Sequence, residues 1–153
     1  MKNTSLCYLV KDGAYLMMHR IKKKNDENHD KWIGIGGKFE HGETPYDCAR
    51  REIKEETGLC AKNLYYRGIV TFVSDLYGTE YMHLFTCADF SGVLKNDCPE
   101  GTLRWVKKEK ITALPIWEGD KIFLNLIDTE ERFFSLKLEY SGEKLISHTL
   151  EYR

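Results

Sequence analysis

The sequence predicts an α+β fold built around a mixed β-sheet. Segments rich in β-branched and aromatic residues outnumber segments with helical spacing, and they occur in runs without a regular strand–helix alternation. The chain has 153 residues, of which 42% are hydrophobic and 31% are charged, so its composition suits a globular domain with a single core. Because the sequence contains neither an internal repeat nor a linker, we expect one domain over residues 1–153.

The N-terminal part predicts a hairpin followed by loops. The segments "SLCYLV" and "AYLMMHR" flank Lys11-Asp12-Gly13, and Asp-Gly is a frequent turn between two strands. Residues 21–31 are polar and basic, which predicts a loop. The next segment, "WIGIGGKFEHGE", is rich in glycine and therefore predicts a loop or a bulged strand in place of a helix.

A helix is predicted to start after Thr44 and to end at Gly58. Thr44 can cap the helix, Pro45 suits its first position, and Asp47 can complete the cap from three residues further on. Gly58 is a typical helix terminator. The apolar stripe that would pack on the sheet consists of Tyr46, Ala49 and Ile53.

The second half of the chain predicts further strands and one more helix. "NLYYRGIVTFVS" and "EYMHLFTCADF" predict strands joined around residues 77–79, and "TLRWVKKEKI" predicts another strand. "EGDKIFLNLI" has helical spacing, with Ile122, Leu126 and Ile127 on one side. "RFFSLKLEY" and "KLISHTLEY", joined through residues 141–143, predict a closing hairpin.

Charge and cysteine content limit the partners and the compartment. The net charge is −1, and no basic tail or stripe indicates a nucleic-acid polymer or an anionic membrane as a partner. The apolar run before Lys11 has five residues, too few for a signal peptide or a membrane span. The five cysteines form no C-x-x-C pair and have no histidine at zinc-ligand spacing. We therefore expect a soluble cytoplasmic protein with reduced, mostly buried thiols.

The predicted helix crowds three carboxylates, Glu52, Glu55 and Glu56, into one short segment. Arg51 can reach Glu55 and Asp47, which would be the ordinary pairing on a solvated helix face. Glu52 and Glu56, however, stand four residues apart, and such a like-charge pair costs a few tenths of a kcal/mol when exposed and more when partly buried. A hard divalent cation such as Mg²⁺, which binds carboxylate oxygens, explains the crowding better.

These residues lie in a pattern that resembles a complete Nudix box. Gly37, five residues, Glu43, seven residues and the run "REIKEETGL" over residues 51–59 match all nine specified positions. The resemblance implies the Nudix fold, a mixed sheet between helices in α/β/α layers, with the box as a loop–helix–loop. It also implies Mg²⁺- or Mn²⁺-dependent hydrolysis of a nucleoside diphosphate linked to another group. By this resemblance the metal ligands are the Gly36 carbonyl, Glu52, Glu55 and Glu56, and the carboxylates are oriented by Arg51 and Glu43.

Outside the box the chain resembles the MutT-type branch, which cleaves oxidised purine nucleoside triphosphates such as 8-oxo-dGTP to monophosphate and pyrophosphate and so sanitises the nucleotide pool. The segments that carry this resemblance are "DKWIGIGGK", "HLFTCADF", "EGTLRWV", "LPIWEGD" and the closing hairpin. It implies phosphate contacts from Arg20 and Lys38, base contacts from Trp117 and Asp120, and a further metal- or water-binding carboxylate at Glu100. An ordinary structural role stays open for four of these residues. Arg20 can be a surface arginine, Trp117 an aromatic residue at the edge of the core, Asp120 an acid at the start of a helix, and Glu100 an acid in a loop.

Two positions in the expected base pocket depart from the branch that reads oxidised guanine. Ile33 stands where an asparagine is expected, and Gly119 where a second acid is expected. Phe72 can line the same pocket or belong to the core. Because an isoleucine side chain cannot form a hydrogen bond, discrimination between bases is weakened. The preferred base, the number of metals, the general base and the choice between monomer and homodimer stay open.

Two other functions are compatible with the sequence. One is a Nudix hydrolase of a different nucleotide, such as ADP-ribose or a dinucleotide. The other is a Nudix module that binds a ligand without cleaving it, although such relatives usually lose glutamates of the box and this box is intact.

Overall fold

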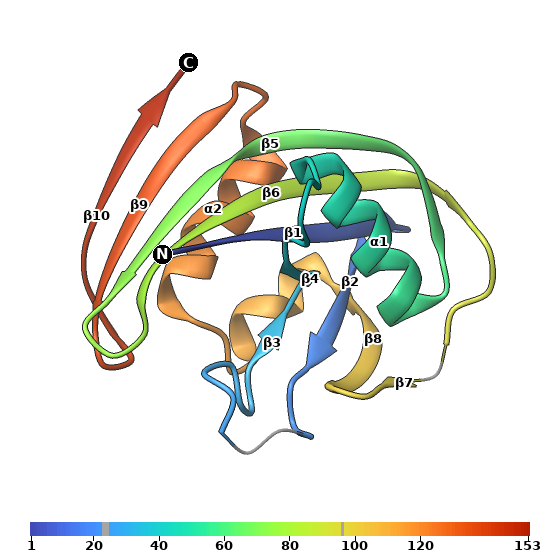
Figure 1. The fold of residues 1–153 in the computed structure, drawn as a ribbon, viewed down its shortest axis with the longest axis horizontal. Helices are drawn as coiled ribbons and strands as arrows, with labels where there is room; N and C mark the ends of the chain where they lie inside the picture. The colour runs from blue at the N-terminus through green and yellow to red at the C-terminus, as the bar shows by residue number, and fades with distance from the viewer. Residues whose placement is uncertain (23–24, 96) are drawn as a thin grey trace.

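The computed structural model describes residues 1–22, 25–95 and 97–153. The elements of this part of the chain are β1 (Lys2–Lys11), β2 (Ala14–His19), β3 (Trp32–Ile33), β4 (Ile35–Lys38), α1 (Pro45–Thr57), β5 (Cys60–Ser74), β6 (Gly78–Ser91), β7 (Asp97–Cys98), β8 (Gly101–Lys107), a 3-10 helix (Lys108–Ala113), α2 (Glu118–Thr129), β9 (Phe134–Ser141) and β10 (Lys144–Tyr152). The strands form a continuous sheet in the order β10-β9-β5-β6-β1-β2-β8-β7, with β3 added beside β2 and β4 beside β1 (Figure 1).

The sheet is mixed, which confirms the predicted α+β class. β1 pairs in parallel with β6, and β5 pairs in parallel with β9. The β1–β2 hairpin, the β5–β6 pair and the closing β9–β10 hairpin are antiparallel. The predicted Asp-Gly turn is also present, because Asp12 and Gly13 have φ angles of 51° and 73°, as a two-residue hairpin turn requires.

Helices α1 and α2 cover opposite faces of the central strands (Figure 1). Successive residues of β1 point to opposite faces, as in any strand. Leu6 therefore belongs to the core that contains Phe123 of α2, whereas Cys7 belongs to the core that contains Ile53 of α1. This is the expected arrangement of a mixed sheet between helices.

Helix α1 begins and ends where the sequence predicts. The Thr44 hydroxyl accepts from the Asp47 amide and the Asp47 carboxylate accepts from the Thr44 amide, both at 3.0 Å. At the other end Gly58 has a φ of 81°, a left-handed conformation suited to glycine. Tyr46 packs on the sheet as predicted, but at its rim: its ring lies edge-on to Phe85, and the residue is 37% exposed.

Several elements depart from the expectations or were absent from them. The strand predicted over "TLRWVKKEKI" stops at Lys107 and continues as the 3-10 helix, and β7 was not predicted. The glycine-rich segment forms the short strands β3 and β4, interrupted at Gly34. Of the loop expected over residues 21–31, Lys23 and Lys24 lie outside the described residues, and residues 25–31 form turns.

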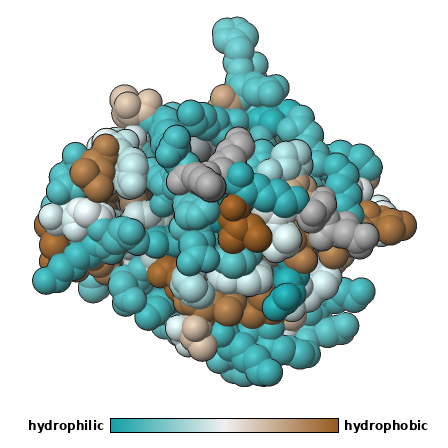
Figure 2. Space-filling model, turned by 90° about the horizontal axis from the view of Figure 1, so that it is seen from below, coloured by the Kyte–Doolittle hydropathy of each residue, from teal (hydrophilic) through white to brown (hydrophobic). Residues whose placement is uncertain are grey.

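Most of the thiols are buried, and the face seen in Figure 2 is mainly polar. All five cysteines are free, and four are buried while Cys60 is exposed. Within the described residues, no helix combines the length and hydropathy needed to cross a membrane. The face shown in Figure 2 is largely hydrophilic, with small hydrophobic areas between polar side chains.

Candidate active site

The glycines of β4 allow the loop before α1 to run close to its neighbours. A Cβ atom at Gly36 would lie 1.8 Å from the Ser5 carbonyl oxygen of β1. A Cβ atom at Gly37 would lie 2.7 Å from the carboxyl carbon of Glu52. Any side chain at these two positions would therefore displace either strand β1 or the carboxylate of Glu52, which explains why the site needs glycine there.

Arg51 binds three carboxylates of the site, those of Glu43, Glu52 and Glu55. Its Nε and Nη2 atoms donate to the two carboxylate oxygens of Glu43 at 2.7 and 2.9 Å, and its Nη1 atom donates to Glu52 at 2.7 Å. Nη1 also donates to Glu55 at 3.3 Å, and Nη2 donates to the Lys38 carbonyl at 3.0 Å. The hydrogen bonds with Glu43 outweigh the effect of burial and raise the pKa of Arg51.

The expected pairing of Arg51 with Asp47 is not formed. The Asp47 carboxylate instead completes the helix cap, and its nearest arginine is Arg50, at 3.9 Å. Arg51 is drawn away by the two-oxygen contact with Glu43, which suits the planar guanidinium better than a single-oxygen contact along the helix.

Glu56 is the buried acid of the cluster. It is 7% exposed and its carboxyl group lies beside that of Glu52. Burial, followed by the neighbouring carboxylate of Glu52 and the charge of Glu100, raises the pKa of Glu56 to about 10, although Arg20 opposes the shift. Among the described residues, its Oε2 atom is buried without a hydrogen-bond partner. Such an atom is costly unless a further group binds it.

These donors suit a divalent cation, although they are not arranged as a finished metal site. All of the side-chain donors are carboxylate oxygens, which Mg²⁺ and Mn²⁺ prefer. Glu52 lies beside Glu56, and Glu100 is close enough for its charge to raise the pKa of Glu56. The side chain of Glu55, by contrast, is 57% exposed and contacts Arg51. In the described part of the chain, no group of three His, Cys, Asp or Glu side chains is already placed to hold a metal.

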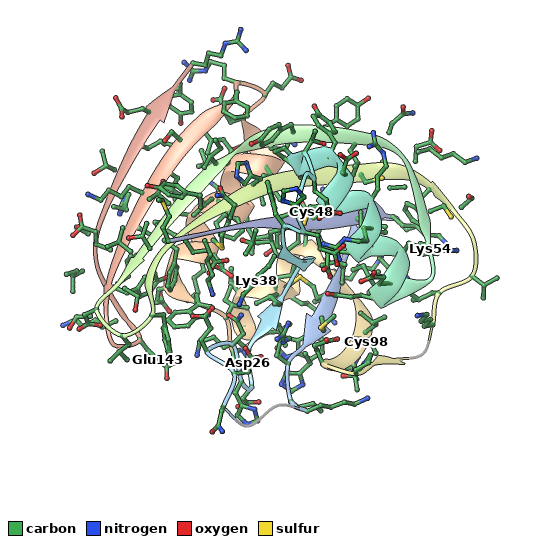
Figure 3. The ribbon with its side chains drawn as sticks, in the orientation of Figure 1. Asp26, Lys38, Cys48, Lys54, Cys98 and Glu143 are labelled. Atoms are coloured by element: carbon green, nitrogen blue, oxygen red, sulfur yellow. The ribbon has the colours of Figure 1, made fainter. Side chains whose placement is uncertain are left out.

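A pocket of about 640 Å³ begins beside this cluster and extends along the sheet. It brings together six side chains predicted from the sequence: Arg20, Ile33, Lys38, Phe72, Trp117 and Asp120. Gly36 lines the end of the pocket near α1. Arg20 connects the pocket to the acid cluster, because its positive charge lowers the pKa of Glu56. Lys38 and Asp26, both labelled in Figure 3, line this pocket.

Trp117 belongs to both the core and the wall of the pocket. It is 4% exposed, and its ring lies edge-on to Phe72 with the centroids 5.3 Å apart. Its Nε1 atom donates to the Asn28 side chain at 2.8 Å, and the Lys31 ammonium lies 4.8 Å from the ring centroid. The ring is therefore fixed in place before any ligand enters.

Asp120 is a buried acid on the pocket wall, in the first turn of α2. Burial raises the pKa of Asp120 to about 8, with a smaller contribution from the charge of Glu80 and an opposing one from Lys31. At neutral pH the carboxyl group is therefore mostly protonated, and it can both donate and accept a hydrogen bond.

The raised pKa predicts how Asp120 affects stability. The ordinary value is 3.8 and the folded value is about 8, so the carboxyl group's contribution to stability is fully present below pH 3.8 and is lost as the pH rises through about 8. We expect Asp120→Asn, which does not titrate, to gain melting temperature relative to the wild type between pH 5 and pH 9. Thermal melts at several pH values measure this gain, with the exposed Asp89→Asn as the control. A constant difference across that range would show that Asp120 keeps an ordinary pKa.

Position 119, where a second acid was expected and Gly119 stands, is closely packed by residues of the core. A Cβ atom at Gly119 would lie 2.5 Å from Leu138 and 2.7 Å from the hydroxyl of Tyr140. The Gly119 amide donates to that hydroxyl at 2.6 Å. Residue 119 therefore has no room for an acidic side chain beside Tyr140.

Three acids that line the pocket, Asp26, Glu27 and Glu80, were not predicted from the sequence, and of these Glu80 lies on a strand, β6. Its signal was present, because Glu80 occupies the same strand phase as Met82 and the core residue Leu84. A charged residue at an otherwise apolar phase of a strand marks a candidate site.

Comparison with known proteins agrees with this geometry. A family model described as the NUDIX domain matches residues 2–127. The chain is 29% identical over 150 residues to the protein named Uncharacterized Nudix hydrolase YvcI of Bacillus subtilis (strain 168), covering 95% of this chain and 91% of that protein. It is 29% identical over 153 residues to the Oxidized purine nucleoside triphosphate hydrolase of Danio rerio, covering 98% and 94% of the two chains.

A solved structure extends the similarity to the whole fold. The crystal structure of a MutT protein from Bacillus halodurans has a TM-score of 0.87 and 27% identity, and the match covers 99% of this chain and 98% of that chain. The NUDIX model covers residues 2–127 of the 153 in this sequence, and the chain therefore belongs to the Nudix family.

Proposed function

We propose that this protein is a divalent-cation-dependent hydrolase that cleaves purine nucleoside triphosphates, oxidised ones such as 8-oxo-dGTP included, to nucleoside monophosphate and pyrophosphate. One observation carries the proposal: a single pocket joins Arg20 and Lys38, beside the acids of α1, to Phe72, Trp117 and Asp120. A nucleotide has a polyanionic end and a flat aromatic end, and the pocket offers a partner for each. The oxidised-purine hydrolase among its relatives supports this substrate class.

The cation would be Mg²⁺ or Mn²⁺, held by the Gly36 carbonyl, Glu52, Glu55 and Glu56, with Glu100 as a further oxygen donor. The unpartnered, buried Oε2 atom of Glu56 and the crowding of its carboxyl group against Glu52, which raises its pKa, support this assignment. When bound, the cation supplies neutralisation of the phosphate oxygens and activation of a water molecule. Arg51 and Glu43 would keep the carboxylates in place through their two-oxygen contact.

The residues of the pocket would position the substrate. Arg20 and Lys38 bring positive charge to the phosphates. Trp117 would form part of the pocket wall beside the base, with the Lys31 ammonium over its ring. Asp120 would bond to the purine edge, while Ile33 contributes only apolar contact. We further propose that the protein acts on free nucleotides in the cytoplasm, as a monomer or homodimer with a single domain over residues 1–153.

A nucleotide panel tests the proposal. Pyrophosphate release from oxidised and normal purine and pyrimidine triphosphates should require Mg²⁺ or Mn²⁺ and should cease in excess EDTA. Turnover of ADP-ribose or a dinucleotide in preference to every triphosphate would replace the substrate class. Nucleotide binding without turnover of any compound would indicate a ligand-binding module.

The bond that breaks can be identified with labelled water. From the resemblance to the MutT-type branch we expect water to attack the β-phosphorus. The incoming oxygen then ends in pyrophosphate. Hydrolysis in ¹⁸O-water followed by mass spectrometry should place the label in pyrophosphate. Label in the monophosphate, or orthophosphate as the first product, contradicts this bond choice.

A further inference from the structure

Glu80 lies at the end of the pocket that is remote from the acid cluster. In the sheet it stands directly beside Lys2 of β1 and Phe72 of β5. Gly36 pairs with Leu6, four residues along β1 from Lys2, which places Glu80 about 13 Å further along the sheet at 3.3 Å per residue. Phe72, its neighbour, contacts Trp117. Glu80 therefore belongs to the end of the pocket where the base would lie.

The carboxylate of Glu80 is held by two groups on the first strand. Its Oε2 atom accepts from the Thr4 hydroxyl at 2.7 Å, and its Oε1 atom lies 3.4 Å from the Lys2 ammonium. Its side chain is 14% exposed. A carboxylate has about four acceptor positions, so these two contacts leave capacity for a donor from a ligand.

The other acids of the pocket are less suited to reading a base. Asp26 accepts from Arg20 at 2.8 Å and from the Asn28 amide at 3.2 Å. Glu27 is bound to Lys2 at 3.0 Å. Both lie on the loop after β2, whereas Glu80 lies on a central strand that is paired on both sides. Groups on a rigid strand define a binding geometry more sharply than groups on a loop.

Asp120 by itself cannot separate the two common purines. A protonated carboxyl group donates once and accepts once. It can pair with the ring nitrogen and amine of adenine, and equally with the carbonyl and ring N–H of guanine. The group that differs between these bases on the same edge is the 2-amino group, a donor that guanine has and that adenine and hypoxanthine lack.

We infer that Glu80 is a specificity-determining residue that accepts a hydrogen bond from the 2-amino group of a purine, and that with Asp120 it selects guanine-type bases. Glu80 is acceptor-only and Asp120 can also donate, so the pair complements the carbonyl, ring N–H and amine of guanine. The second acid absent at position 119 is thus supplied from the sheet. This inference rests on the proposed function for its substrate class.

The experiment compares ligands that differ only in the 2-amino group. Binding of dGMP and dIMP is measured by calorimetry without metal, and kcat/KM is measured for dGTP and dITP. A hydrogen bond to a charged group corresponds to about tenfold or more, so the wild type should prefer the guanine compound by at least that factor. Glu80→Gln, which keeps the shape but loses the charge, should reduce the preference several-fold in both measurements.

Two further variants separate recognition from folding. Thr4→Val removes the hydroxyl that fixes Oε2 and should lower the dGMP preference in part, which keeps the test decisive if Glu80→Gln does not fold. Asp89→Asn, on the same strand but exposed, should leave the preference unchanged.

The outcomes are distinct from those of the proposed function. An equal affinity of the wild type for dGMP and dIMP, or an unchanged preference in Glu80→Gln and Thr4→Val, would overturn the role of Glu80 and leave it a structural partner of Lys2. Failure to hydrolyse any triphosphate would overturn the proposed function, and the binding ratio would still decide the role of Glu80.

Discussion

Replacing Glu56 with glutamine is expected to remove nearly all hydrolysis, by about 10²–10³-fold or more. The carboxamide keeps the shape of the side chain but not the charge that a divalent cation needs. Glu56 is the most buried acid of α1, so water cannot readily substitute for a lost ligand there. Pyrophosphate release at saturating Mg²⁺ measures the loss.

The same substitution should leave the fold intact, because the buried Glu56 carboxyl group destabilises the protein once it is ionised. The pKa of Glu56 rises from 4.5 to about 10 on folding, so its contribution to stability is fully present below pH 4.5 and is lost as the pH approaches 10. Glutamine does not titrate. In EDTA at pH 8, Glu56→Gln should therefore melt no lower than the wild type, and added Mg²⁺ should stabilise the wild type only.

Two results would contradict this account. Full activity of Glu56→Gln would remove Glu56 from the metal site. A variant that is inactive and also strongly destabilised in EDTA would give the carboxyl group a role in folding instead. Glu139→Gln, an acid with a partly exposed side chain on β9, is the control for the general effect of removing one charge.

Local signals in the sequence were sufficient to predict α1 and its acids. Thr44, Pro45 and Gly58 define the helix limits through backbone geometry and capping, which depend on nearby residues only. The burial of Glu56 also follows locally, because it lies next to the stripe that contains Ala49 and Ile53. These features need no knowledge of the rest of the fold.

Features that depend on distant pairings could not be predicted in the same way. The parallel pairing of β1 with β6 joins segments more than 70 residues apart, and it alone places Lys2 and Thr4 beside Glu80. Whether position 119 has room for a side chain depends on Tyr140, which reaches it from β9. Sequence spacing contains neither fact, which is why the pocket was predicted with one base-reading acid and the structure contains a second candidate.

Arg51→Lys is expected to lower activity by about 10- to 100-fold, the usual effect of disturbing a residue that orients metal ligands. Lysine keeps the positive charge but provides a single ammonium group in place of a planar fork. It cannot donate at once to both oxygens of Glu43, to Glu52 and to the Lys38 carbonyl, as Arg51 does. Glu52 should then be free to turn away from Glu56, and the affinity for Mg²⁺ should fall together with kcat.

Arg50→Lys provides the matched control for this prediction. Arg50 is the preceding residue of α1, its side chain is 52% exposed, and its nearest acid is Asp47 at 3.9 Å. The same chemical change at this exposed position should alter activity by less than about twofold, because surface ion pairs contribute about 0–1 kcal/mol. Activity as a function of Mg²⁺ concentration is measured for both variants. If Arg51→Lys behaved like Arg50→Lys, the carboxylates would hold their positions through α1 itself, and Arg51 would contribute charge without orientation.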